Sequence, residues 1–177
     1  MIERIAILGT GLLGTSAGLA LRAAGFRGSI TGWNRGAEQA QTALAMGAID
    51  TIATDPLQAA RESQVTLLCV PIYATLDLME KLSGVLGPEH LVTDVGSTKA
   101  QITETAARLF NAAERAAFLP GHPMAGKERG GAALADAKLF RGAVWLFTDV
   151  PTWERSQAAT ALVHGWREWV VAMGAET

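Results

Sequence analysis

A glycine-rich turn between a strand pattern and a helix pattern constrains this chain more than any other feature. Residues 9–14 read G-T-G-L-L-G, directly after an apolar run and at the start of a helical pattern. In this context the first glycine permits a tight turn, the second lets the backbone approach a pyrophosphate, and the third lets helix and strand pack closely. The amino end of the helix then offers free N–H groups to the phosphates. The residues expected to bind a dinucleotide here are Gly9, Gly11, Leu12, Leu13 and Gly14.

Short apolar runs of β type alternate with Ala- and Leu-rich helical patterns along the whole chain. This alternation predicts parallel strands joined by right-handed crossovers, hence an α/β fold with a doubly wound, mostly parallel sheet of the Rossmann type. We expect one dinucleotide-binding domain over residues 1–177. Strands are predicted over Ile2–Leu8, Ser29–Trp33, Ala48–Ala53, Val65–Val70, Leu91–Asp94, Ala117–Leu119 and Ala143–Phe147. Helices are predicted over Leu12–Ala24, Ala37–Met46, a short segment from Pro56, Tyr73–Leu86, Thr98–Ala112 and Thr152–Met173.

Composition excludes several classes of protein. Hydrophobic residues make up 49% of the chain and charged residues 18%, which excludes a disordered chain. The net charge of -2 argues against nucleic-acid binding, and the one cysteine excludes a disulfide framework and a multi-cysteine metal site. The uncharged run 5–21 contains four glycines, too many for a membrane span or signal. We therefore expect a cytoplasmic protein with no membrane contact and no bound metal.

The end of the second predicted strand bears on the choice of cofactor. A carboxylate about 20 residues after the glycines would favour NAD, because it accepts from the ribose 2′-hydroxyl. Asn34 stands there instead, followed by Arg35. The amide removes the repulsion that a carboxylate would exert on a 2′-phosphate, and the guanidinium offers a bidentate partner for it. The sequence thus favours NADP over NAD, with a solvated loop cation as the alternative for Arg35.

The strand over Val65–Val70 ends in C-V-P. The carboxyl ends of the strands face the cofactor crevice in this architecture, so Val70 and Pro71 are expected to line it. Cys69 is predicted to be an inert core thiol, because apolar surroundings raise the pKa of a thiol.

Two further segments carry residues suited to chemistry. The first, D-V-G-S-T-K over Asp94–Lys99, leads from a strand into a helix, and Ser97 or Thr98 is also a plausible N-cap. The second, G-H-P-M-A-G-K-E over Gly121–Glu128, holds a histidine between glycine and proline. That setting suits the presentation of an imidazole at a crevice edge better than core packing, so His122 is the main catalytic candidate.

Together, the three motifs resemble the nucleotide-binding domain of the prephenate and arogenate dehydrogenases, enzymes of tyrosine biosynthesis. The resemblance extends over essentially the whole chain, and its most specific part is H-P-M-A-G-K-E. It implies an NAD(P)-dependent oxidative decarboxylation. A hydride leaves the ring carbon bearing the hydroxyl, carbon dioxide is lost, and the ring becomes aromatic.

The resemblance also implies roles for individual residues. His122 would act as the general base on the substrate hydroxyl, a role suited to imidazole because it titrates near neutral pH. Ser97 would hold the same hydroxyl or orient the imidazole. Glu128 would shape the edge of the substrate pocket, with a solvated loop residue as the alternative. Lys99 would attract a phosphate or carboxylate.

Members of this family continue into an all-helical domain that dimerises and contributes cations to the substrate site. Our chain ends at Thr177, so we expect a truncated form of a homodimeric enzyme, weakly active or inactive alone, with that domain absent. The last predicted helix carries an apolar stripe that suits packing on the sheet. Its tryptophans, with Trp153, are candidates for surface that a further domain would cover.

Two alternatives remain open. The chain could be a nucleotide-binding module or sensor without catalysis of its own. It could instead be a reductase of imines or β-hydroxy acids on the same fold, although those families lack the H-P-M-A-G segment.

Overall fold

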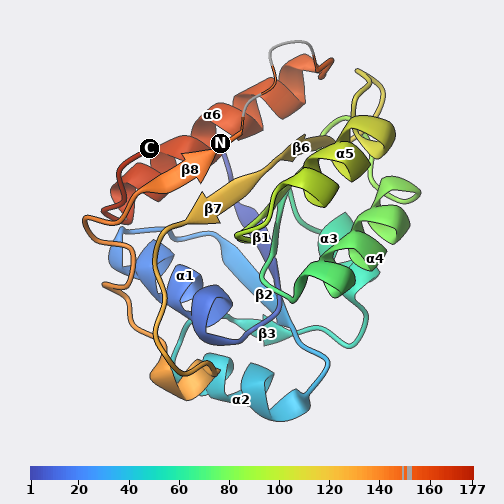
Figure 1. Cartoon of the computed structure of the whole chain (residues 1–177). Coiled ribbons are helices and arrows are strands. Elements are labelled where there is room, and N and C mark those ends of the chain that lie inside the picture. The colour runs from blue at the N-terminus through green and yellow to red at the C-terminus, as the bar shows by residue number, and fades with distance from the viewer. Residues whose placement is uncertain (149, 151–152) are drawn as a thin grey trace.

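A six-stranded parallel sheet forms the centre of the molecule (Figure 1). The computed structural model describes residues 1–148, 150 and 153–177. The strand order β3-β2-β1-β4-β5-β6 confirms the doubly wound architecture, with β1 and β4 side by side where the order reverses. The strands are β1 (Arg4–Leu8), β2 (Ser29–Trp33), β3 (Thr51–Ile52), β4 (Val65–Leu68), β5 (Leu91–Asp94) and β6 (Ala117–Leu119).

Helices cover both faces of the sheet, because alternate side chains of each strand enter opposite cores. In β1, Ile5 and Ile7 pack on one side, whereas Ala6 and Leu8 pack on the other. The first core receives α1 (Leu12–Ala23), α2 (Ala37–Ala45) and α6 (Gln157–Ala172), and the second receives α3 (Pro56–Arg61), α4 (Ile72–Ser83) and α5 (Ala100–Leu109). Figure 1 shows α1 and α6 on one side of the sheet and α4 and α5 on the other.

A second, two-stranded sheet follows β6. Its strands, β7 (Gly121–Pro123) and β8 (Trp145–Phe147), are antiparallel and pair His122 with Leu146. The predicted strand at 143–147 is therefore real but lies outside the parallel sheet. The segment between β7 and β8 contains a 3₁₀ turn, η1 (Ala132–Leu134), which packs against α1 and α2.

The predicted starts of the last and the fifth helix are wrong, for local reasons. The last helix begins at Gln157 rather than at residue 152, because the Ser156 side chain accepts from the Ala159 N–H and caps it. Thr152 itself lies outside the described residues. The fifth helix begins at Ala100 with Lys99 as N-cap, and no side chain caps it, so the N-cap role considered for Ser97 and Thr98 is wrong.

The tryptophans of α6 pack inward. Trp166 is fully buried, and Trp169 is half-buried and meets the ring of Phe26 edge-on at 5.2 Å. Trp153 packs against the second core. The expectation that the apolar stripe of α6 packs on the sheet is therefore confirmed, and the three tryptophans do not form the exposed surface for which they were candidates.

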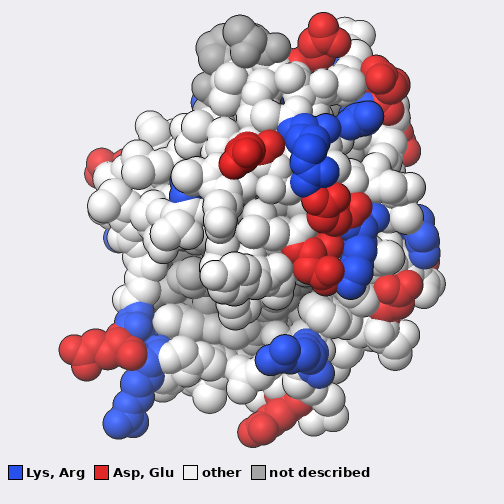
Figure 2. Space-filling view, turned by 45° about the vertical axis from the view of Figure 1, so that its right-hand side comes forward, with Lys and Arg blue, Asp and Glu red and all other residues white. Residues whose placement is uncertain are grey.

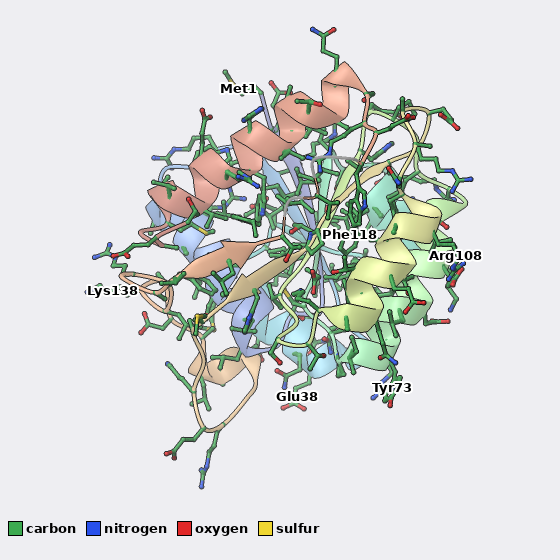
Figure 3. The ribbon with its side chains drawn as sticks, turned by 45° about the horizontal axis from the view of Figure 1, so that its top comes forward. Met1, Glu38, Tyr73, Arg108, Phe118 and Lys138 are labelled. Atoms are coloured by element: carbon green, nitrogen blue, oxygen red, sulfur yellow. The ribbon has the colours of Figure 1, made fainter. Side chains whose placement is uncertain are left out.

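The carboxyl ends of the parallel strands and the amino ends of the helices meet at one edge of the sheet. Glu38 and Tyr73, near the amino ends of α2 and α4, both lie along this edge in Figure 3. Over α4 and α5, acidic and basic side chains are interspersed (Figure 2), including the exposed pairs Lys81–Asp77 and Arg108–Glu80. No helix of the described chain is both long enough and apolar enough to cross a membrane.

Candidate active site

The glycine turn after β1 is shaped by close contacts within the protein. Gly9 has φ +107°, and a Cβ there would lie 2.3 Å from the carbonyl oxygen of Cys69. A Cβ on Gly14 would lie 2.0 Å from the carbonyl oxygen of Gly9. Any side chain at either position would therefore displace the turn, which explains two of the three glycines.

Gly11 differs from these two glycines because nothing lies within 4 Å of the position its Cβ would occupy. Gly11 is the N-cap of α1, no side chain caps this helix end, and its first turn carries no acidic residue. The helix thus presents backbone N–H groups of its first turn, which includes Leu12 and Leu13, beside open space. A dinucleotide pyrophosphate fits this arrangement, and Gly11 leaves the room that it requires.

The end of β4 lies directly beside the turn. The Cys69 N–H donates to the Leu8 carbonyl at 2.7 Å, and the Val70 side chain comes within 2.8 Å of a Cβ built on Gly9. Pro71 is exposed and is the N-cap of α4. Val70 and Pro71 therefore stand at the same strand edge as the glycine turn. Burial raises the pKa of the Cys69 thiol, and the Asp94 charge raises it further, so this thiol is un-ionised at neutral pH.

Asn34 shapes the turn from the end of β2. Its Oδ1 accepts from the Thr10 N–H at 3.2 Å, and its Nδ2 donates to the Gly36 carbonyl at 3.0 Å. The amide therefore joins the glycine turn to the start of α2, a role that no local sequence pattern indicates. Arg35 is exposed, and its guanidinium has no hydrogen bond or ion pair among the described residues. It remains available to a ligand at this edge.

The segment after β5 is organised around the carboxylate of Asp94. Gly96 N–H donates to Asp94 Oδ2 at 2.8 Å, and Lys99 Nζ donates to the same oxygen. Burial raises the pKa of Asp94 and lowers that of Lys99, and the attraction between the two charges opposes both changes. Lys99 is therefore paired within the protein, whereas Ser97, which lies in the chain between the anchored residues Gly96 and Lys99, is exposed.

His122 lies in the middle of β7 with a half-buried side chain. The strand starts beside the end of β5, because the Gly121 N–H donates to Asp94 Oδ1 at 3.1 Å. The same carboxylate thus contacts both segments that carry the catalytic candidates. Asp94 together with its partners Gly96, Lys99 and Gly121 is called the Asp94 junction below. Within the described residues, the Ser97 hydroxyl and the His122 ring make no hydrogen bond to each other.

Glu128 lies apart from this junction in sequence, on the exposed stretch 126–130 between β7 and η1. Beyond it the chain is held against α2 by a bond from the Ala132 N–H to Gln39 Oε1 at 2.7 Å. A bond from the Asp136 N–H to Ser16 Oγ at 3.0 Å holds it against α1. Glu128 itself makes no hydrogen bond or ion pair to the described part of the chain. No group of three His, Cys, Asp or Glu side chains that could hold a metal ion occurs among the described residues.

Comparison with known proteins identifies the family. Residues 17–169 match the model of the prephenate dehydrogenase nucleotide-binding domain. The chain belongs to this family. The matched range contains both the Asp94 junction and His122. It begins after the glycine turn, so the geometry of that turn is an independent observation.

Named relatives agree with this family. The chain is 35% identical over 165 residues to a prephenate dehydrogenase of Lactococcus lactis subsp. cremoris, covering 93% of this chain and 44% of the relative. It is 29% identical over 169 residues to a cyclohexadienyl dehydrogenase of Zymomonas mobilis, covering 95% of this chain and 56% of the relative. Among solved structures, Synechocystis arogenate dehydrogenase superimposes with a TM-score of 0.83 at 28% identity, covering 98% of this chain and 58% of that one. The chain therefore spans only about half the length of these relatives.

Proposed function

We propose that this chain is the nucleotide-binding domain of an NAD(P)-dependent dehydrogenase of tyrosine biosynthesis that acts on prephenate or arogenate. The observation that carries the proposal is the Asp94 junction, which brings the segments of Ser97 and His122 together at the same sheet edge as the glycine turn. The names of the relatives support the substrate class, because they include prephenate, cyclohexadienyl and arogenate dehydrogenases.

The residues proposed to hold the cofactor fall into three groups along the edge. The first turn of α1 binds the pyrophosphate, Asn34 and Arg35 receive the ribose end, and Val70 and Pro71 line the crevice. A nicotinamide dinucleotide supplies the hydride acceptor when bound. The guanidinium of Arg35 is exposed and has no ion pair with any residue that the structure describes, which supports NADP over NAD, because it can pair with a 2′-phosphate without first breaking such a pair.

His122 acts in the proposed reaction as the general base. It accepts the proton of the substrate hydroxyl as the hydride leaves the carbon that bears it. Ser97 donates a hydrogen bond to the same oxygen and orients it toward the imidazole. Loss of carbon dioxide makes the ring aromatic, which supplies the driving force. The chain's main tasks are then to align the hydroxyl and to take one proton.

Lys99 and Glu128 have weaker support as substrate-pocket residues. The Lys99 ammonium already donates to Asp94, so it can attract a carboxylate only through its remaining N–H groups. Glu128 can reach a substrate only if its exposed stretch lies over the crevice. A homodimer formed through a further domain stays a prediction, which sedimentation of the gene product that carries this chain would check.

Two measurements test the proposal. Calorimetric titration of this chain with NAD and NADP separately is expected to show binding of both, with NADP tighter. Prephenate or arogenate should then drive the formation of reduced cofactor, followed at 340 nm, by the gene product that carries this chain. Cofactor binding without turnover of either substrate would favour a nucleotide-binding module. Absence of cofactor binding would refute the site, and tighter binding of NAD would overturn the roles of Asn34 and Arg35.

A further inference from the structure

Asp94 is the one charged residue among the described residues that is fully buried. It ends β5, and only 1% of its side chain is exposed. Both carboxylate oxygens are used, since Oδ1 accepts from the Gly121 N–H and Oδ2 accepts from the Gly96 N–H and from Lys99 Nζ. These partners come from two segments that are far apart in the sequence, so the carboxylate joins them in space.

The two backbone partners of Asp94 are both glycines, and each has a steric reason to be one. A Cβ on Gly96 would lie 2.9 Å from Asp94 Oδ2, and a Cβ on Gly121 would lie 2.6 Å from the Asp94 carbonyl oxygen. A larger residue at position 96 would crowd the carboxylate itself, and one at position 121 would push the start of β7 away from the end of β5. Each glycine also immediately precedes a catalytic candidate, Ser97 in one segment and His122 in the other.

We infer that Asp94 is a positioning residue, which holds the segments of Ser97 and His122 in one fixed relative arrangement for catalysis. The inference rests on the proposed function of this site. Lys99 donates to Asp94 Oδ2, and its charge opposes the rise that burial causes in the pKa of Asp94, so its main role is to maintain the junction rather than to bind a ligand.

The energetic cost of this arrangement supports the inference. Burying a carboxylate and an ammonium carries a desolvation penalty, and apolar residues of similar volume often give equal or greater stability. Burial accordingly raises the pKa of Asp94. The junction is thus a poor way to stabilise the fold, because of its desolvation penalty. It is an effective way to fix the N–H groups of Gly96 and Gly121, because charge-assisted hydrogen bonds are strong and directional. A shift of about 1 Å in a reacting group lowers rates by about a hundredfold, which gives such fixation its value.

The junction can first be tested in the unmodified chain by NMR. As the Asp94 carboxyl group is titrated, its carboxyl ¹³C signal and the amide signals of Gly96 and Gly121 should all shift with one common midpoint. Among the described residues, the titratable groups that interact with Asp94 are Lys99, whose pKa burial lowers, and Cys69, whose pKa burial raises. If either amide signal fails to follow the carboxyl, Asp94 does not join the two segments and the inference is overturned. This measurement requires no variant to fold.

The functional consequence is tested with Asp94→Asn in the gene product that carries this chain. We expect kcat to fall about a hundredfold while KM and the cofactor dissociation constant stay within about threefold, because alignment is lost and binding surfaces remain. The matched control is Asp77→Asn, the same change in the exposed Asp77–Lys81 pair of α4, which should leave all three constants unchanged. Rates are compared per mole of folded protein, so that lower stability is not counted as lower activity.

The outcomes separate this inference from the proposed function. An Asp94→Asn variant with kcat within about threefold of the unmodified protein, beside a strongly impaired His122→Asn, overturns the positioning role. Equal losses in kcat and in cofactor affinity also overturn it, since they would indicate general disruption. Absence of turnover in the unmodified protein would refute the proposed function instead. The NMR titration would still decide whether Asp94 joins the two segments.

Discussion

The glycine turn after β1 and the Asp94 junction after β5 lie at the same sheet edge but are built in opposite ways. The turn uses backbone and small residues and presents the uncapped amino end of α1 beside open space at Gly11. The junction uses a buried ion pair in which both carboxylate oxygens have partners within the protein.

This difference separates binding from positioning. A region that receives a ligand must leave donors free, because the ligand completes their hydrogen bonds. A region that aligns reacting groups must be rigid before the ligand arrives, because alignment acquired during the reaction would raise the barrier. Changes in the turn should therefore affect cofactor affinity, whereas changes near the junction should affect turnover.

The largest expected effect comes from a pair of glycine substitutions within the turn. Gly14→Ala should lower the free energy of unfolding by about 3 kcal/mol or more, because its Cβ would overlap the Gly9 carbonyl oxygen at 2.0 Å. Gly11→Ala should fold with a change within about 1 kcal/mol, since its Cβ meets nothing. It should nevertheless weaken cofactor binding at least about tenfold by filling the space left for the phosphates. Denaturant unfolding and calorimetry measure both effects, and equal destabilisation by the two changes would contradict the division of roles among the glycines.

The second prediction tests the catalytic side. His122→Asn should lower kcat about a hundredfold or more in the gene product that carries this chain, because the general base is lost. The cofactor dissociation constant should not change, since the glycine turn is intact. His164→Asn, on an exposed position of α6, is the matched control and should leave kcat unchanged. A loss of less than about threefold for His122→Asn would remove the imidazole from the mechanism.

The features predicted correctly from the sequence depend on local patterns. The alternation of strands and helices and the turn at residues 9–14 follow from neighbouring residues, and the structure has them where expected. The start of α6 was wrong because one hydroxyl, on Ser156, decides it. The strand β7 was missed because three residues, Gly121–Pro123, carry almost no periodic signal, and its antiparallel pairing with the predicted strand at 143–147 was therefore missed as well.

The role of Asp94 could not be predicted from the sequence, because its partner Gly121 lies 27 positions away. Periodicity places Asp94 at the end of a strand but says nothing about what its carboxylate meets. One signal was available, a charged residue that ends the apolar strand Leu91–Asp94 and is followed by Lys99. The same limit applies to Asn34, whose bond to the Thr10 N–H depends on how β1 and β2 pair.

A smaller effect is expected at the ribose end of the cofactor site. Arg35→Ala should weaken NADP binding about tenfold and leave NAD binding unchanged, because only NADP carries the 2′-phosphate. Arg27→Ala makes the same charge change in the exposed connection between α1 and β2, at the opposite edge of the sheet, and should affect neither cofactor. Separate titrations of each variant with NAD and NADP measure the difference. An equal loss for both cofactors would show that Arg35 does not read the 2′ position.

The smallest effect is expected at the exposed ion pair between Arg108 of α5, labelled in Figure 3, and Glu80 of α4. The hydrogen bond from Arg108 lowers the pKa of Glu80 below its ordinary value. A carboxyl group with a lowered folded pKa stabilises the fold above its unfolded pKa and loses that contribution as the pH falls through the folded value. Glu80→Gln should therefore lower Tm slightly at neutral pH and not at acidic pH, and added salt should remove the difference. If the change in Tm persisted in high salt, solvent exposure would not weaken the Arg108–Glu80 pair. The exposed pair would then no longer differ in this respect from the buried Asp94–Lys99 pair.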